Sequence, residues 1–188
     1  MSVACVVIAS AKRRALLDTE VMPSVLVAGF DEVVVVGEYH AGEGYRYLEV
    51  PPLTQSTTDA LVKRDVGTLA TTSDWLFYVC DDHAVRKLGT VPTDPTMIGV
   101  PARYCHVENM TVLLNMGLDE RDPDSPYCGG HAGLYSRPLI QSHPWSTMPH
   151  DRLWDLYASR IFVRAGATLK SLPDWEIEDL EPEAHPWR

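Results

Sequence analysis

Two carboxylates and an imidazole stand side by side at Asp81, Asp82 and His83. Carboxylate oxygens and imidazole nitrogens are ligands for divalent cations such as Mn²⁺ and Mg²⁺, and a bound cation can in turn hold a diphosphate. If strand geometry continues through these residues, Asp81 and His83 point to one side and Asp82 to the other. The pattern therefore predicts a metal pair made of Asp81 and His83. A solvated turn is the alternative, because Asp is common in turns.

The residues before this cluster predict a buried strand. Trp75–Cys80 is apolar at every position, which is typical of a central strand in a sheet that is covered on both faces. The expected elements of this half are a strand over Val3–Ala9, a helix over residues 15–27 interrupted by Pro23, strands over residues 31–37 and 45–50, a helix over residues 60–70, and the strand Trp75–Cys80. This order predicts an α/β protein with a mostly parallel central sheet, flanked by helices and joined by right-handed crossovers.

Ligands in open α/β sheets bind outside the carboxyl ends of the strands, which is where Asp81 would lie. Ser10 and Arg13 follow the first strand and are expected at the same edge. Arg13 could meet a phosphate there, and a solvated helix start is the alternative.

The second half of the chain has weaker patterns. Its expected elements are irregular structure over residues 84–102, a strand around residues 111–114, a mobile polar flap over residues 119–126, a helix over residues 151–165 ended by Gly166, and an extended segment over residues 168–180. Cys105-His106 with Cys128 and His131 could form a structural zinc site, but adjacent ligands diverge, so buried thiols and loop histidines are the favoured interpretation.

Composition limits the class of protein. A chain of 188 residues with 45% hydrophobic residues predicts one domain with a full core. The formal net charge of -10 does not favour nucleic-acid binding, which needs a basic face. No apolar run is long enough to span a bilayer, and the four scattered cysteines are typical of reduced thiols in a cytoplasmic protein.

Residues 60–83 resemble the core of the GT-A-fold glycosyltransferases. In that family, a helix with an Arg-Asn-like pair leads into the strand before an Asp-x-Asp motif. Some members, the polypeptide N-acetylgalactosaminyltransferases among them, have Asp-x-His instead, which Asp81-Asp82-His83 matches. The resemblance implies that Asp81 and His83 bind metal and diphosphate, that Asp82 lies near the ribose or sugar, and that Arg64 and Asp65 touch the nucleotide sugar.

Three later motifs extend the resemblance. Gly129-Gly130, followed by Arg137, is similar to a loop that approaches the sugar or acceptor. In inverting members an Asp at a helix start, about eleven residues before a Gly, is the catalytic base. Counting back from Gly166 favours Asp155, while Asp151, one helical turn earlier, is a competitor that could instead be an N-cap. His185 matches a His that many members use as a further metal or diphosphate ligand.

Taken together, the resemblance implies a single-domain GT-A glycosyltransferase covering residues 1–188, with a nucleotide-sugar donor, a divalent metal (Mn²⁺ or Mg²⁺) and an acceptor that the sequence does not identify. Two alternatives stay open. One is a sugar-phosphate nucleotidyltransferase, although the Gly-rich loop expected after its first strand is missing from Ser10 to Arg14. The other is a non-catalytic nucleotide-sugar-binding protein of the same fold. The oligomeric state is not predicted.

Overall fold

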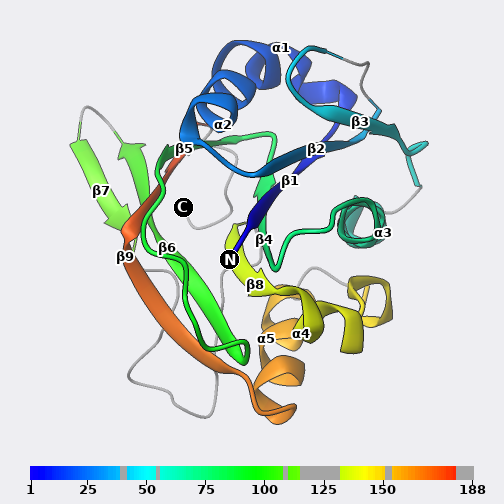
Figure 1. The fold of residues 1–188 in the computed structure, drawn as a ribbon. Helices are drawn as coiled ribbons and strands as arrows, with labels where there is room; N and C mark the ends of the chain where they lie inside the picture. The colour runs from blue at the N-terminus through cyan, green and yellow to red at the C-terminus, as the bar shows by residue number, and fades with distance from the viewer. Residues whose placement is uncertain (39–41, 54–55, 108–109, 115–131, 151–153, 181–188) are drawn as a thin grey trace.

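The computed structural model describes residues 1–38, 42–53, 56–107, 110–114, 132–150 and 154–180. The described strands form one nine-stranded sheet in the order β3-β2-β1-β4-β8-β6-β9-β5, with β7 paired to β6 (Figure 1). The strands are β1 (Val3–Ala9), β2 (Glu32–Gly37), β3 (Arg46–Glu49), β4 (Trp75–Cys80), β5 (His83–Lys87), β6 (Met97–Val107), β7 (Met110–Leu114), β8 (Gly133–Ser136) and β9 (Thr168–Asp179). The helices are α1 (Arg14–Leu16), α2 (Met22–Ala28), α3 (Ser56–Ala70), α4 (Arg137–Ser142) and α5 (Trp154–Arg164).

The centre of the sheet is parallel, as the sequence predicts. Strand β1 lies between β2 and β4 and pairs in parallel with both, and β3 extends the parallel set beyond β2. All seven residues of β1 are buried, which explains why its sequence is apolar on both faces. The α/β class and the covered sheet are therefore confirmed.

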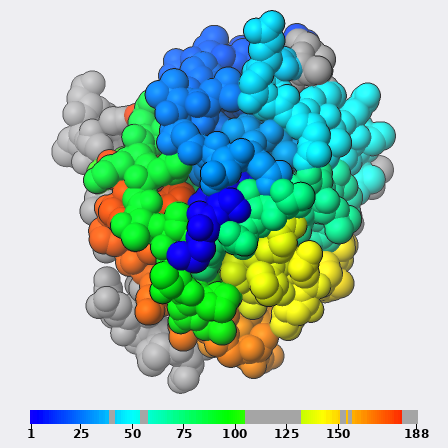
Figure 2. Space-filling view, viewed as in Figure 1, coloured from blue at the N-terminus to red at the C-terminus, as the bar shows by residue number. Residues whose placement is uncertain are grey.

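Two groups of helices cover the two faces of this sheet (Figure 1). Leu17, Val21 and Val25, from the helical stretch over residues 14–28, pack in one core cluster with alternate residues of β1 and β4. Helices α3, α4 and α5 pack in a second cluster with the residues between those. Gly67 lets α3 approach β1 closely, because a Cβ there would lie 2.2 Å from Val6 Cγ1. Figure 2 shows the first residues of the chain at the surface, between the parts that carry α2 and α4.

The helical stretch before β2 is less regular than predicted. Between α1 and α2 the chain forms a π-helical segment, Leu17–Val21, and Pro23 stands in the first turn of α2, where its missing N–H leaves no donor unused. Helix α2 ends at Gly29, whose φ of 91° is the left-handed conformation that glycine adopts readily.

The prediction of irregular structure over residues 84–102 holds for residues 88–96 and is wrong for the residues on either side, which form strands. Strand β5 begins at His83, and β6 runs for eleven residues, Met97–Val107. Prolines argued against strands here. However, the register between β6 and β9 shifts between Pro101 and Ala102, and at such an irregularity a strand tolerates a residue with no N–H.

The later elements agree better with the sequence. The extended segment predicted over residues 168–180 is β9. The helix predicted over residues 151–165 is α5, and Gly166 follows it with a left-handed φ of 94°. The flap expected over residues 119–126 lies outside the described residues. Within the described part of the chain, no helix combines the length and the apolar character needed to cross a membrane.

Candidate functional site

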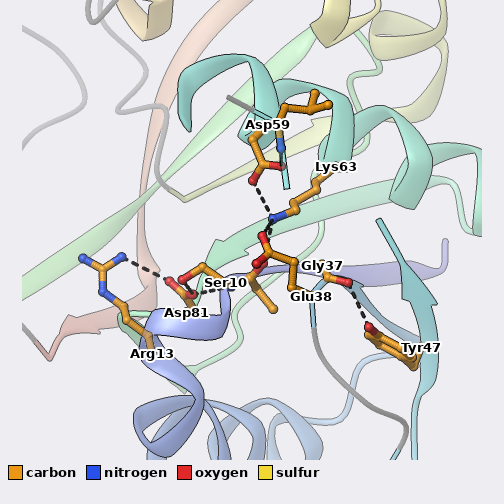
Figure 3. Close-up of polar contacts among 10 residues, drawn as sticks. Ser10, Arg13, Gly37, Glu38, Tyr47, Asp59, Lys63 and Asp81 are labelled. Carbon is orange, nitrogen blue, oxygen red and sulfur yellow. Dashed lines mark hydrogen bonds and ion pairs between the residues drawn. The ribbon is translucent and has the colours of Figure 1, made fainter. Parts of the chain in front are cut away.

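The carboxyl ends of β1, β2 and β4 meet at one edge of the sheet (Figure 3). Ser10 follows β1, Glu38 follows β2 and Asp81 follows β4. The backbone N–H of Asp81 donates to the carbonyl of Ile8, at 3.1 Å, so the turn after β4 is held against the end of β1. Polar side chains from three separate segments therefore converge where ligands bind in α/β sheets.

Asp81 is held by the residues that follow β1. Its Oδ2 accepts hydrogen bonds from the backbone N–H of Ser10 at 2.6 Å and from the Ser10 hydroxyl at 2.7 Å. Its Oδ1 lies 3.2 Å from Nη1 of Arg13. Burial raises the pKa of the Asp81 carboxyl; the hydrogen bonds from Ser10 and the charge of Arg13 act in the opposite direction without outweighing it, and Asp82 adds to the rise.

Arg13 bridges both carboxylates of the turn. While Nη1 faces Asp81, Nη2 lies 3.3 Å from Oδ2 of Asp82. The Arg13 side chain is 31% exposed, whereas each carboxylate side chain is only 5% exposed. One guanidinium thus offsets two nearly buried negative charges, and the prediction that Ser10, Arg13 and Asp81 share one edge of the sheet agrees with this geometry.

His83 pairs with Asp82, which differs from the predicted Asp81–His83 pair. Its Nδ1 lies 2.5 Å from Oδ1 of Asp82, and the imidazole is fully buried. The reason is local: β4 ends at Cys80 and residues 81–82 form a turn, so the alternation of a strand does not extend through them. His83 is instead the first residue of β5, and in the antiparallel pairing of β5 with β9 it lies opposite Asp179.

The end of β9 also holds this turn. The backbone N–H of Leu180 donates to the carbonyl of Asp82 at 2.9 Å. Behind it, Arg103 Nη2 donates to Asp179 Oδ2 at 2.7 Å, in a buried ion pair. The turn that carries the two carboxylates is therefore supported from a strand almost a hundred residues later in the chain.

Lys63 of α3 contacts the residues that follow β1 and β2, and the sequence did not indicate this role. Its side chain is 1% exposed. Its Nζ donates at 3.0 Å to the carbonyl of Ala9, which is the residue before Ser10 (Figure 3). The same Nζ lies 2.5 Å from Asp59 and 3.5 Å from Glu38. An i,i+4 spacing of Asp59 and Lys63 was the only signal, and it is typical of many solvated helices.

Arg64 lies in an aromatic cage. Its guanidinium carbon is 4.7 Å from the ring centre of Trp154, 5.4 Å from that of Trp145 and 5.7 Å from that of Tyr78. Its Nη2 also reaches Sγ of Cys80, at 3.9 Å, so the cage joins the end of β4 to the start of α5. Cation–π contacts of this kind are strongest when desolvated, and Arg64 is 1% exposed.

Asp65 has contacts with the same segment. Its two carboxylate oxygens accept from the backbone N–H groups of Trp145 and Ser146, each at 2.8 Å. Asp65 thus holds the short 3-10 turn Trp145–Thr147 that precedes α5. A contact of Arg64 or Asp65 with a nucleotide sugar remains a prediction.

The other predicted residues are only partly described. Gly129, Gly130, Asp151 and His185 lie outside the described residues, as do Cys128 and His131 of the alternative zinc site. The backbone of Asp155 lies in the first turn of α5. Arg137 lies elsewhere: it donates to the carbonyls of Ser73 and Thr68, so it holds the segment before β4, at the opposite end of that strand from Asp81.

The residues of the turn fit a divalent cation in their chemistry. Within the described ranges, no three His, Cys, Asp or Glu side chains are grouped so that they could hold a metal ion. However, Asp81 and Asp82 already share one cation, the guanidinium of Arg13, and carboxylate oxygens are ligands that Mn²⁺ and Mg²⁺ accept. The fit is to these two carboxylates, because the imidazole of His83 faces Asp82.

No family model matches this sequence, and no curated protein does. Solved structures do resemble it. GalNAc-T7, crystallised with UDP, GalNAc and Mn²⁺, superposes with a TM-score of 0.57 and 11% identity over 98% of this chain and 45% of that one. S. aureus TarS gives a TM-score of 0.62 and 14% identity over 97% of this chain and 61% of that one. The chain therefore has the GT-A fold of glycosyltransferases, and it spans less than two thirds of either neighbour.

Proposed function

We propose that this protein transfers a sugar from a nucleoside-diphosphate sugar to an acceptor hydroxyl, with a divalent cation, Mn²⁺ or Mg²⁺, at its active site. The observation that carries the proposal is the cluster of Ser10, Arg13, Asp81 and Asp82 at the carboxyl edge of a GT-A sheet. A diphosphate with its metal needs carboxylates for the cation and a guanidinium or hydroxyl for the phosphate oxygens. The cluster brings all three groups together from two segments, the residues that follow β1 and the turn that follows β4.

Each residue of the cluster has a role in this proposal. Asp81 and Asp82 present carboxylate oxygens to the cation, and His83 holds the Asp82 carboxylate from behind. Ser10 orients Asp81 through its N–H and hydroxyl, and Arg13 faces the diphosphate. A bound cation would offset the negative charge that develops on the leaving nucleoside diphosphate. His185 stays a predicted further ligand.

Arg64 and Asp65 act on the site through their neighbours in this proposal. The aromatic cage around Arg64 holds Trp145 and Trp154 against α3, and the hydrogen bonds of Asp65 hold the backbone of Trp145 and Ser146 there. Asp155 follows Trp154 directly, so this support favours Asp155 as the base that takes the proton of the acceptor hydroxyl, with Asp151 as the competitor. Gly129 and Gly130 are proposed to border the acceptor.

Release of nucleoside diphosphate from nucleotide sugars tests this function. With Mn²⁺ and the matching donor, the wild-type protein should release UDP, GDP, ADP or dTDP, and Asp81→Ala should lower the rate by at least about 100-fold, since it removes an interaction with the leaving group. Asp18→Ala, which removes an exposed carboxylate of the helical stretch after β1, should leave the rate unchanged.

Two results would argue against transfer. No release from any of these donors, with or without added acceptors, would contradict the proposed activity. Donor binding without any release would instead favour the non-catalytic nucleotide-sugar-binding alternative.

A further inference from the structure

All four carboxylate oxygens of the turn after β4 have a partner. Asp81 Oδ2 accepts from Ser10, and Asp82 Oδ1 faces His83. The two remaining oxygens, Asp81 Oδ1 and Asp82 Oδ2, face the guanidinium of Arg13 at 3.2 and 3.3 Å. Arg13 therefore engages the two oxygens that are not already fixed by the protein from behind.

Those two oxygens are also the ones that a divalent cation would need. A metal ligand must offer a lone pair to the ion, and the guanidinium of Arg13 already occupies lone pairs of these same two oxygens. Two cations cannot share this position, because both would be repelled at short range. A metal ion at these two oxygens therefore competes with the Arg13 ion pairs to Asp81 and Asp82.

The guanidinium of Arg13 is positioned so that it can move away from Asp81 and Asp82. Arg13 lies in the short 3-10 turn Ala11–Arg13, none of whose residues is buried, and its side chain is 31% exposed. The side chain is partly exposed and extends from this turn, which is outside the sheet, so the guanidinium can change rotamer without movement of the sheet once its ion pairs break. An arginine released beside a metal-bound diphosphate has a bidentate partner at hand in the phosphate oxygens.

We propose that Arg13 exchanges partners when the donor binds: a divalent cation displaces its guanidinium from Asp81 and Asp82, and the guanidinium then binds the diphosphate. This inference rests on the proposed function. Its consequence is a coupling between two ligands, because the metal alone must break the Arg13 ion pairs, whereas the metal with a diphosphate gives Arg13 a new partner. Each ligand should then raise the affinity for the other by the same factor.

Direct titration of Mn²⁺, followed by the electron paramagnetic resonance signal of the free ion, tests this exchange. Without nucleotide, Arg13→Gln should bind Mn²⁺ about tenfold more tightly than wild type, since no guanidinium competes. With UDP present the order should reverse or the difference should disappear, because Arg13→Gln has lost its phosphate contact. Arg13→Lys, which keeps the charge without the fork, should lie between them.

Controls separate this site from general attraction to an acidic protein. Arg14→Gln changes the neighbouring, exposed arginine and should bind Mn²⁺ as wild type does. A combined Asp81→Asn and Asp82→Asn variant should lose the binding. Thermal unfolding of Arg13→Gln checks that this variant folds. If it does not fold, the Mn²⁺ titration of Arg13→Lys tests the exchange instead.

Two results would overturn the inference, and they differ. Equal or weaker Mn²⁺ binding by Arg13→Gln in the absence of nucleotide, beside normal binding by wild type with UDP, would overturn the exchange alone. If no variant bound Mn²⁺, even with UDP, GDP or ADP, the metal-dependent function would fail together with the exchange.

Discussion

The imidazole of His83 determines how Asp82 presents its carboxylate. It is fully buried and lies 2.5 Å from Oδ1 of Asp82, while the other oxygen, Oδ2, lies 3.3 Å from the guanidinium of Arg13. Such a partner orients a ligand without touching the ion, as the groups behind metal ligands commonly do. In this account, His83 is a positioning residue.

Replacing His83 with two different residues tests this role. His83→Ala removes a buried partner of a carboxylate and should lower the free energy of unfolding by about 2–3 kcal/mol. His83→Asn, whose amide N–H can reach the position of Nδ1, should recover part of this loss and most of the Mn²⁺ affinity. Urea unfolding and Mn²⁺ titration measure the two quantities. Equal loss of Mn²⁺ binding in both variants would indicate that His83 is itself a ligand.

The sequence indicates which residues of the turn do chemistry but not how they pair. Asp81, Asp82 and His83 stand out because an apolar strand ends at them. Their pairing depends on the turn between β4 and β5 and on the N–H of Leu180, which holds the Asp82 carbonyl from the end of β9. Contacts across such a separation leave no local pattern in a single sequence.

At the scale of elements, α3 ties the edge of the sheet together through Lys63. This buried ammonium joins the carbonyl at the end of β1 to Glu38 after β2, and Asp59 completes its partners. Removing one partner of a buried ion pair leaves the others with uncompensated charge, which is costly.

Lys63→Met should therefore lower the free energy of unfolding by about 3 kcal/mol and weaken nucleotide binding, because the end of β1 carries Ser10. Lys63→Arg should restore part of both. Lys87→Met, which changes a lysine that is 55% exposed in β5, is the matched control and should have little effect. Urea unfolding and UDP titration measure the changes. A Lys63→Met variant as stable as Lys87→Met would contradict this role.

Another link between elements depends on pH. Glu32, at the start of β2, accepts from Ser73 and Thr72, in the turn between α3 and β4. Burial acts to raise the pKa of Glu32, but the hydrogen bonds from Ser73 and Thr72 outweigh it, so the pKa lies below its ordinary value. A carboxyl with a lowered pKa contributes stability above its unfolded pKa and loses it as the pH falls through the folded pKa.

Glu32→Gln should accordingly lower the free energy of unfolding at pH 7 by about 1 kcal/mol, a small value because the group is only partly buried. The difference from wild type should shrink as the pH falls below the ordinary value of 4.5. Unfolding curves between pH 3 and pH 7 check the prediction, with the exposed Glu20→Gln as control. A difference that stays constant down to pH 3 would exclude the carboxylate as its source.

Elements were predictable where the apolar pattern was continuous. Strands β1 and β4, and strand β2 after Glu32, have sequences that are apolar without interruption, and most of their residues are buried. Strands β5 and β6 were missed because β5 has only three buried residues and because Pro101 interrupts β6 at its irregular pairing. Their conformation is set by pairing with β9, which the local sequence cannot express.

At the scale of the molecule, the site is assembled by the whole sheet. Ser10 and Arg13 come from the beginning of the chain, Asp81 and Asp82 from its middle, and the backbone that holds their turn comes from the end of β9. The formal net charge of -10 favours a cation at this edge and means that phosphates need local partners such as Arg13. The fold class followed from the sequence, whereas this assembly required the structure.

Thermal unfolding with UDP and Mn²⁺ tests the central claim, a metal-dependent nucleotide-sugar site at Asp81 and Asp82, most directly. A ligand present at 100 times its dissociation constant adds about 2.7 kcal/mol to the stability of the folded state, which for a chain of this size raises Tm by about 5–10 °C. We expect this rise with UDP or another nucleoside diphosphate only when Mn²⁺ is present, and we expect none in Asp81→Asn. A rise of the same size in Asp81→Asn, or no rise in wild type with any nucleoside diphosphate and Mn²⁺, would contradict the account.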